Sequence, residues 1–226
     1  QIGVGRIPDA VGNLLDGHKD LGVHTEMFSV SLMNLMKKGV INNSRKSLKP
    51  GKTVFAFAGG QRATQEIYDF VDNNPDIEMN PISWVNDPYV VAELTNFISI
   101  NSAIAVDLTG QVCSESIGTT TFSGPGGQAD FIRGAKLAPG GQSYILINST
   151  GKKKDGTLFS KINLALAPGS GVTGSRADVQ YIVTEYGVAE IRFRSIAERA
   201  RAMISIAHPQ FREQLTYEAR KAGYFI

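Results

Sequence analysis

The chain has 226 residues, of which 42% are hydrophobic and 19% charged, so it is long and apolar enough to fold around a buried core. Its 23 basic and 21 acidic residues nearly balance, which argues against a basic nucleic-acid coat or a membrane-surface adhesive. The single cysteine, Cys113, excludes an internal disulfide framework and has no histidine or second cysteine nearby for a metal site.

No segment approaches the roughly 18 consecutive apolar residues that a membrane-spanning helix needs. The first residues, QIGVGRIPDA, lack the basic and apolar regions of a signal peptide. These features predict a cytoplasmic protein without a membrane segment. Because the start has the pattern of a strand, a glycine turn and a helix, with no initiating methionine, we also expect an earlier part of the protein to be absent.

The first half of the chain alternates helical and strand patterns. A helix is expected from about residue 8 to 17, because the fixed φ of Pro8 suits a first helical turn. A strand over 22–26 and a helix over 29–38 follow, and the helix ends on two lysines and a glycine. A strand at 53–58, a helix at 65–71 and an extended piece at 77–82 complete this half.

Strand patterns recur in the second half, with alternating β-branched residues at 97–108, 142–147, 161–165 and 179–185. The lysine-rich segment GKKKDG at 151–156 predicts an exposed hairpin loop rather than a phosphate site. Ser195 and Glu198 have the spacing of a capping box for a helix that ends near residue 207, and a last helix covers 211–222. The alternation predicts an α/β fold, one large, mixed and mainly parallel sheet covered by helices, as a single domain over residues 1–226.

The segment GVHTEM at 22–27 is the first candidate for chemistry. Side chains alternate along a strand, so His24 and Glu26 lie on one face, and ligands of α/β sheets usually bind at the carboxyl ends of strands. Glu26 is therefore a candidate catalytic carboxylate. On spacing alone, a helix-capping or ion-pairing role for Glu26 is the stronger interpretation.

A second candidate is the glycine-rich segment SGPGGQADF at 123–131, which precedes a helix. Backbone N–H groups at Gly126 and Gly127 could approach an anionic oxygen closely, as in a phosphate cradle or an oxyanion hole. A simple tight turn explains the same pattern equally well. The segment matches neither a P-loop nor a dinucleotide-binding fingerprint.

Together, these motifs resemble the acetyl-CoA hydrolase/transferase family, in particular the C-terminal half of 4-hydroxybutyrate and acetate CoA-transferases. The resemblance covers essentially all of the chain. It is carried by GVG and IP at 3–8, GVHTEM at 22–27, YDFVDNN at 68–74, Asn101, GGQ and DF at 126–131, and VTEYGVA at 183–189. It implies a CoA-transferase catalytic domain, an absent N-terminal domain of the same protein, and a homodimer or tetramer.

The resemblance assigns the nucleophile to Glu26, which would form a glutamyl-CoA thioester while CoA moves between an acyl-CoA and acetate, butyrate or 4-hydroxybutyrate. From its position after a strand and before Gly187, Glu185 is expected to support the structure, either by orienting active-site groups or through a local salt bridge. The implied mechanism needs no metal or redox cofactor, and the balanced composition predicts no nucleic-acid or membrane partner. Two alternatives stay open: an acyl-CoA hydrolase, or a noncatalytic CoA-binding module, since Val30-Ser31 stand where the family has Asp-Gly. The residues that it places around CoA are Gln1, Ile2, Gly3, Val4, Gly5, Asn101, Gly126, Gly127 and Lys161.

Overall fold

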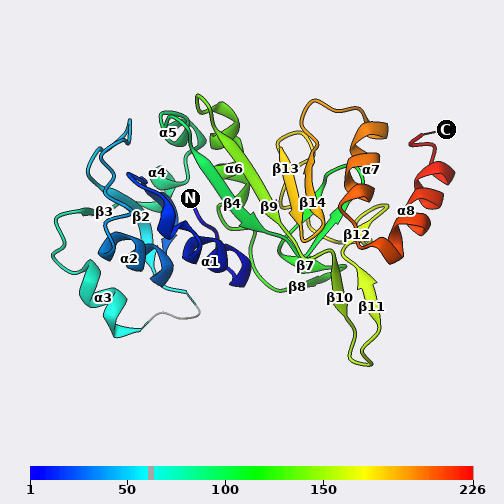
Figure 1. Ribbon diagram of the computed structural model, residues 1–226, viewed down its shortest axis with the longest axis horizontal. Helices are drawn as coiled ribbons and strands as arrows, with labels where there is room; N and C mark the ends of the chain where they lie inside the picture. Colours follow the sequence, from blue (N-terminus) through cyan, green and yellow to red (C-terminus); the bar gives the residue numbers. More distant parts are fainter. Residues whose placement is uncertain (61–63, 226) are drawn as a thin grey trace. The chain divides into compact units, whose positions relative to one another are not determined.

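The computed structural model describes residues 1–60 and 64–225, and the chain forms two compact units (Figure 1). The first unit comprises Gln1–Asn101 with Asp130–Gln142, and the second Ser102–Ala129 with Ser143–Ile226. Both units combine strands with helices, as the α/β prediction requires. Most predicted site residues before residue 102 therefore belong to one unit, and those after it to the other.

A parallel three-stranded sheet organises the first unit, in the order β1 (His24–Phe28), β2 (Thr53–Ala58) and β3 (Ile77–Met79). The helices of this unit are α1 (Arg6–Asn13), α2 (Val30–Lys37), α3 (Gln65–Val71), α4 (Ile82–Val85), α5 (Pro88–Ala92) and α6 (Gln128–Leu137), which begins in the second unit; a 3₁₀ turn at Leu15–Gly17 follows α1.

Neighbouring residues of β2 pack on opposite faces of this sheet, because side chains alternate along a strand. Phe55 joins Leu32 and Met33 of α2 in one buried cluster, and its ring stacks on Phe28 at 4.8 Å between centroids. Val54 joins a second buried cluster with residues of α4, α5 and α6. The sheet is thus covered on both faces, which explains why the central strand β2 is almost continuously apolar.

The second unit contains short strands in several small sheets. β5 (Ala105–Asp107) lies between β12 (Ile162–Asn163), which is parallel to it, and β6 (Val112–Cys113), which is antiparallel. β13 (Tyr181–Thr184) pairs in parallel with β9 (Gln142–Leu146) and antiparallel with β14 (Gly187–Glu190). Two hairpins are formed by β7 (Ser116–Ile117) with β8 (Thr120–Thr121) and by β10 (Thr150–Lys152) with β11 (Leu158–Ser160).

Several expected elements differ from the observed ones. The expected strand at 22–26 runs instead from His24 to Phe28, so Glu26 lies in the middle of β1 and not at its end. The expected strand at 97–108 divides into β4 (Ile98–Ser102) and β5, and the single large sheet is replaced by smaller ones. The hairpin loop at 151–156 is confirmed, and its lysines are exposed.

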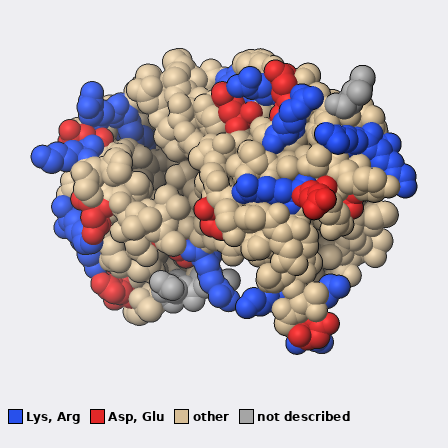
Figure 2. All heavy atoms as spheres, turned by 45° about the vertical axis from the view of Figure 1, so that its right-hand side comes forward, with Lys and Arg blue, Asp and Glu red and all other residues tan. Residues whose placement is uncertain are grey.

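No helix among the described residues is long and apolar enough to cross a membrane. Figure 2 shows blue and red atoms interspersed over the face in view, without a broad area of one sign. This distribution agrees with the balanced composition, so an anionic ligand would have to be held by local groups.

The predicted capping box starts helix α7 (Ile196–Ser205), which packs beside α8 (Pro209–Lys221). The Ser195 hydroxyl accepts the Glu198 backbone N–H at 3.3 Å, and a Glu198 carboxylate oxygen accepts the Ser195 backbone N–H at 2.8 Å. We expect Ser195→Ala to lower the free energy of unfolding by about 1 kcal/mol, because the Glu198 backbone N–H loses its acceptor. Urea denaturation of both proteins measures this difference, and an unchanged midpoint would contradict it.

Candidate active site

Glu26 occupies the centre of β1, between residues that are fixed by packing on both sides of the sheet. Thr25 and Met27 beside it are buried. In the register of the sheet, Thr25 pairs with Phe55 of β2 and Met27 pairs with Phe57. Glu26 itself is only half-buried. A rigid strand thus presents a partly accessible carboxylate, which is the arrangement that a positioned nucleophile requires.

His24 lies two residues before Glu26 in β1 and is 2% exposed. Its Nε2 lies 2.7 Å from the Val85 carbonyl oxygen; since a carbonyl can only accept, Nε2 carries the proton and donates. Among the described residues, Nδ1 has no hydrogen-bond partner. The ring is surrounded by Trp84, Phe97 and Phe131, whose centroids lie 5.7, 6.5 and 6.4 Å away.

Burial lowers the pKa of His24 from its ordinary value of 6.5 to about 4; the bond to Val85 opposes this shift and the charge on Lys46 adds to it. His24 is therefore neutral at physiological pH and cannot supply a positive charge near the carboxylate. Its bond to α4 instead anchors the start of β1. The sequence indicated that His24 shares a face with Glu26, but not that it lies in an aromatic enclosure.

Lys46 is a half-buried cation that the sequence analysis did not single out. Its ammonium donates to the carbonyl oxygens of Val23 at 2.9 Å and Lys52 at 2.6 Å, so it ties the loop after α2 to the residue before β1. Burial lowers the Lys46 pKa to about 8, and the Glu78 carboxylate partly opposes this. Its side chain packs directly over Gly22, where a Cβ would come within 2.4 Å of Lys46 Cγ.

The structure brings the predicted loop Gln1–Gly5 together with Asn101. The Gln1 side chain donates from Nε2 to Asn101 Oδ1 and accepts from Asn101 Nδ2, each at 3.1 Å, and its Oε1 also accepts from the Ser99 hydroxyl at 2.9 Å. The Gly3 backbone N–H donates to the Ile100 carbonyl at 2.7 Å. A Cβ on Gly3 would come within 2.4 Å of Asn101 Oδ1, so only glycine permits this approach.

This loop is also tied to the strand that carries Glu26. The Thr25 hydroxyl donates to the Ile2 carbonyl oxygen at 3.3 Å, and Ile2 is buried in the same cluster as Phe28. Gly5 then precedes α1 with φ 136°, a conformation that glycine alone adopts readily. Gln1–Gly3, Asn101 and β1 therefore form one connected framework within the first unit.

Three of the residues predicted to bind CoA belong to the second unit, whereas Glu26 belongs to the first: Gly126, Gly127 and Lys161. Gly126 has φ 59° and is exposed, whereas Gly127 and Gln128 are buried at the start of α6. Gln128 Nε2 has no partner among the described residues, which marks a donor that a ligand could satisfy. The sequence motif contained Gln128, but only the structure shows that its side-chain donor is buried without a partner among the described residues.

Glu185 and Lys161 have different surroundings. The Glu185 carboxylate accepts the Ser149 backbone N–H at 2.9 Å and the Ser149 hydroxyl at 2.5 Å, which explains a structural role within the second unit. Burial opposes ionisation of Glu185, but these hydrogen bonds outweigh it and lower its pKa. Lys161 is half-buried, and its backbone forms hydrogen bonds with the backbone of Ser149 and of Val106.

No group of potential metal ligands occurs among residues 1–60 and 64–225.

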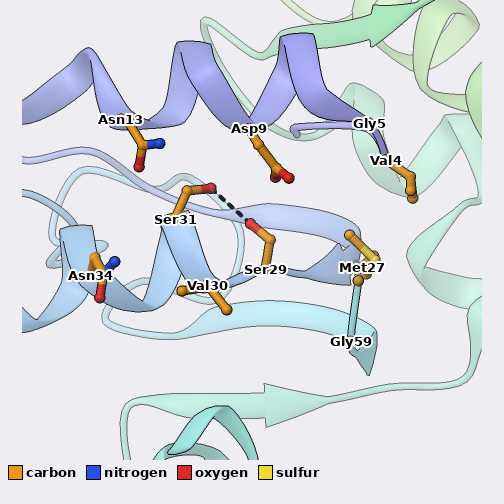
Figure 3. Close-up of a pocket in the computed structure, with 11 residues that line it drawn as sticks. Val4, Gly5, Asp9, Asn13, Met27, Ser29, Val30, Ser31, Asn34 and Gly59 are labelled. Atoms are coloured by element: carbon orange, nitrogen blue, oxygen red, sulfur yellow. Dashed lines mark hydrogen bonds between the residues drawn. The ribbon is translucent and has the colours of Figure 1, made fainter. Parts of the chain in front are cut away.

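A pocket of about 80 Å³ lies at the carboxyl ends of β1 and β2 (Figure 3). Ser29 and Val30 follow β1, Gly59 and Gly60 follow β2, and Val4 precedes α1. The pocket therefore adjoins both the loop that was predicted to bind CoA and the strand of Glu26. Its full lining is Val4, Gly5, Asp9, Asn13, Met27, Ser29, Val30, Ser31, Asn34, Gly59 and Gly60.

Comparison with known proteins places this geometry in context. Residues 63–219 match the family model described as acetyl-CoA hydrolase/transferase C-terminal domain. Over 98% of its length the chain is 52% identical to 4-hydroxybutyrate coenzyme A transferase of Clostridium kluyveri and 48% identical to succinyl-CoA:cyclohexane-1-carboxylate CoA transferase of Geobacter metallireducens. It covers 50% and 49% of these proteins, so the chain spans about half the length of the curated relatives it matches.

Comparison of the fold with solved structures also finds a similar protein. The crystal structure of RipA from Yersinia pestis superposes with a TM-score of 0.91 and 40% sequence identity, over 100% of this chain and 49% of that chain. The two curated relatives are named for different acids. Similarity therefore supports the type of reaction but does not select the acid.

Proposed function

Because the chain belongs to the acetyl-CoA hydrolase/transferase family, we propose that it provides the catalytic nucleophile of a CoA-transferase that acts on small carboxylic acids. The observation that supports this best is the connection between β1 and the Gln1–Gly5 loop. The hydrogen bond from the Thr25 hydroxyl to the Ile2 carbonyl links the strand of Glu26 to the framework of Gln1 and Asn101. A carboxylate and a candidate thioester-binding loop are thus held together.

The proposed reaction begins when the Glu26 carboxylate attacks the carbonyl carbon of an acyl-CoA. The C–S bond breaks, and a mixed anhydride and CoA thiolate form. The thiolate then attacks the Glu26 carbonyl of the anhydride, which releases the first acid as its carboxylate and leaves a glutamyl-CoA thioester. An acceptor carboxylate repeats these two steps in reverse, so no net proton or electron is transferred.

A free carboxylate is a weak nucleophile, so most of the rate must come from positioning and from binding energy of the remote parts of CoA. Within this proposal, Gln1–Gly5 and Asn101 position the thioester near Glu26. The resemblance also assigns Gly126 and Gly127 to the thioester and Lys161 to the CoA phosphates. Backbone N–H groups are suited to an oxyanion, and losing one such donor typically costs on the order of 100-fold or more in rate.

The transferase and hydrolase interpretations differ in their need for an acceptor acid. The full-length protein is expected to convert acetyl-CoA and butyrate into acetate and butyryl-CoA in equal amounts, without release of free CoA. Chromatography of the CoA esters measures this directly. Free CoA that accumulates equally with and without butyrate would instead establish a hydrolase, and CoA binding without turnover a binding module.

The domain organisation, oligomeric state and cellular location of the full-length protein remain predictions. An N-terminal domain of the same protein, a homodimer or tetramer, and a cytoplasmic location are all expected from the resemblance and the composition. Analytical ultracentrifugation of the full-length protein would determine its oligomeric state.

A further inference from the structure

Lys46 differs from several nearby lysines in the groups that hold its side chain. Within the described residues it forms no ion pair, and its Nζ bonds instead to the backbone carbonyl oxygens of Val23 and Lys52. Three other lysines of the first unit pair with carboxylates at 2.6, 2.6 and 2.9 Å: Lys37, Lys38 and Lys49. A neutral carbonyl favours the charged form of a lysine less than a carboxylate does.

The two hydrogen bonds leave one direction of the Lys46 nitrogen open. A lysine ammonium has three N–H groups, and two of them donate here to carbonyl oxygens at 2.9 and 2.6 Å. When the third proton leaves, the lone pair that remains points away from both carbonyl groups, because the bonds around nitrogen are tetrahedral. The hydrogen bonds thus orient the lone pair of the neutral amine before any reaction.

Lys46 lies at the surface of the first unit, where dissolved molecules can approach it. The residue is half-buried, and its chain neighbours Arg45 and Ser47 are exposed. Its side chain packs over Gly22, which is itself exposed. The lysine is therefore desolvated by its neighbours without being enclosed in the core.

This partial burial makes the amine of Lys46 neutral far more often than that of an ordinary lysine. Burial lowers its pKa from 10.5 to about 8, and the Glu78 carboxylate only partly opposes the shift. At pH 8 about half of the Lys46 side chains are then neutral, compared with fewer than about 1 in 100 for an ordinary lysine. A nucleophile becomes weaker as its pKa falls, which offsets roughly half of this gain on a logarithmic scale and leaves about a tenfold advantage.

We propose that Lys46 is a site of N-acylation by acyl-CoA thioesters, and that this modification weakens the attachment of β1, the strand that positions Glu26. The neutral Nζ attacks the thioester carbonyl carbon, an N–C bond forms and the C–S bond breaks. CoA leaves as a thiolate, which takes up the proton released by the nitrogen. Only the effect on activity rests on the proposed CoA-transferase function, since the acylation itself needs nothing except acyl-CoA.

Acylation changes both properties through which Lys46 holds the start of β1. The acylated nitrogen is an uncharged amide with a single N–H group, so at least one of the carbonyl oxygens of Val23 and Lys52 loses its donor. Val23 is buried and directly precedes β1. One lost hydrogen bond of this kind corresponds to about a tenfold change, so we expect kcat of the acylated protein to fall about tenfold. Acyl-CoA that accumulates would thus slow the enzyme that consumes it.

The first test incubates the full-length Glu26→Gln protein with acetyl-CoA at pH 8, so that no glutamyl thioester competes, and locates acetyl groups by mass spectrometry of its peptides. We expect Lys46 to be acetylated about ten times faster than Lys153, an exposed lysine of the hairpin loop. Lys46→Arg keeps the charge and the donors, so it should remove the first signal and leave that of Lys153 unchanged. Acetylation of Lys46 at the rate of Lys153, or more slowly, would overturn the proposed site.

The second test follows kcat for CoA transfer in the wild type after graded acetylation and removal of the excess reagent. The loss of kcat should be proportional to the acetylated fraction of Lys46. Lys46→Gln resembles the acetylated side chain and should lower kcat about tenfold, whereas Lys153→Gln, the matched control, should leave it unchanged. Circular dichroism of each variant distinguishes a displaced strand from a lost fold.

The outcomes separate the modification from the proposed function. Acetylation of Lys46 without any loss of CoA transfer would overturn its effect on β1. Acetylation of Lys46 in a protein that transfers no CoA would support the modification site and overturn the proposed function instead. Loss of activity that follows acetylation of Lys153 and not of Lys46 would overturn the assignment.

Discussion

Glu26→Gln is expected to lower kcat for CoA transfer by at least roughly 1000-fold, because the amide cannot form the anhydride and thioester that the reaction requires. Substrate binding should change far less, since the replacement has nearly the same size and Glu26 is only half-buried in a strand fixed on both sides. Glu26→Asp keeps the carboxylate but withdraws it by one methylene, and a displacement of about 1 Å costs on the order of 100-fold.

The covalent intermediate provides the decisive measurement. Incubation of the full-length protein with acetyl-CoA, reduction with borohydride and mass spectrometry should detect a modified peptide that contains Glu26 in the wild type and not in Glu26→Gln. Glu66→Gln is a suitable control, because Glu66 is an exposed carboxylate that pairs with Lys37 at 2.6 Å. If Glu26→Gln turned over at the wild-type rate, the assignment of the nucleophile would be wrong.

The second large effect concerns stability at acidic pH. The pKa of His24 is about 4 in the folded protein and 6.5 for an ordinary histidine, because burial disfavours its charged form. Between these values the unfolded chain binds a proton that the folded chain does not. Stability is therefore lost as the pH falls from 6.5 through 4, by about 3 kcal/mol in total from this group.

His24→Gln should remove most of this dependence, because the amide can still donate to Val85 and does not titrate. We expect its unfolding free energy to vary less than that of the wild type between pH 6.5 and 4 in urea denaturation. His18→Gln serves as the control, since His18 is exposed and its replacement should leave the wild-type slope unchanged. Parallel pH profiles of His24→Gln and the wild type would show that His24 is not the group responsible.

Local patterns were sufficient for several elements of the fold. The predicted ranges 53–58 and 65–71 coincide with β2 and α3, and the S-x-x-E spacing located the start of α7. Periodicity and capping depend on residues within a few positions of each other, so one sequence contains the information that they need. The family was recognised in the same way, from short motifs, and the comparisons confirm the family.

The sequence by itself thus determined the α/β class, the family and the candidate nucleophile Glu26. Only the tertiary structure decided that β1 continues to Phe28, because Met27 and Phe28 pair with β2 some thirty residues later in the chain. It also decided that His24 is neutral within an aromatic enclosure, and that Ser29 and Ser31 meet Asp9 in one pocket. The physical reason is that burial and hydrogen-bond partners come from segments far apart in sequence, whose proximity exists only after the chain has packed.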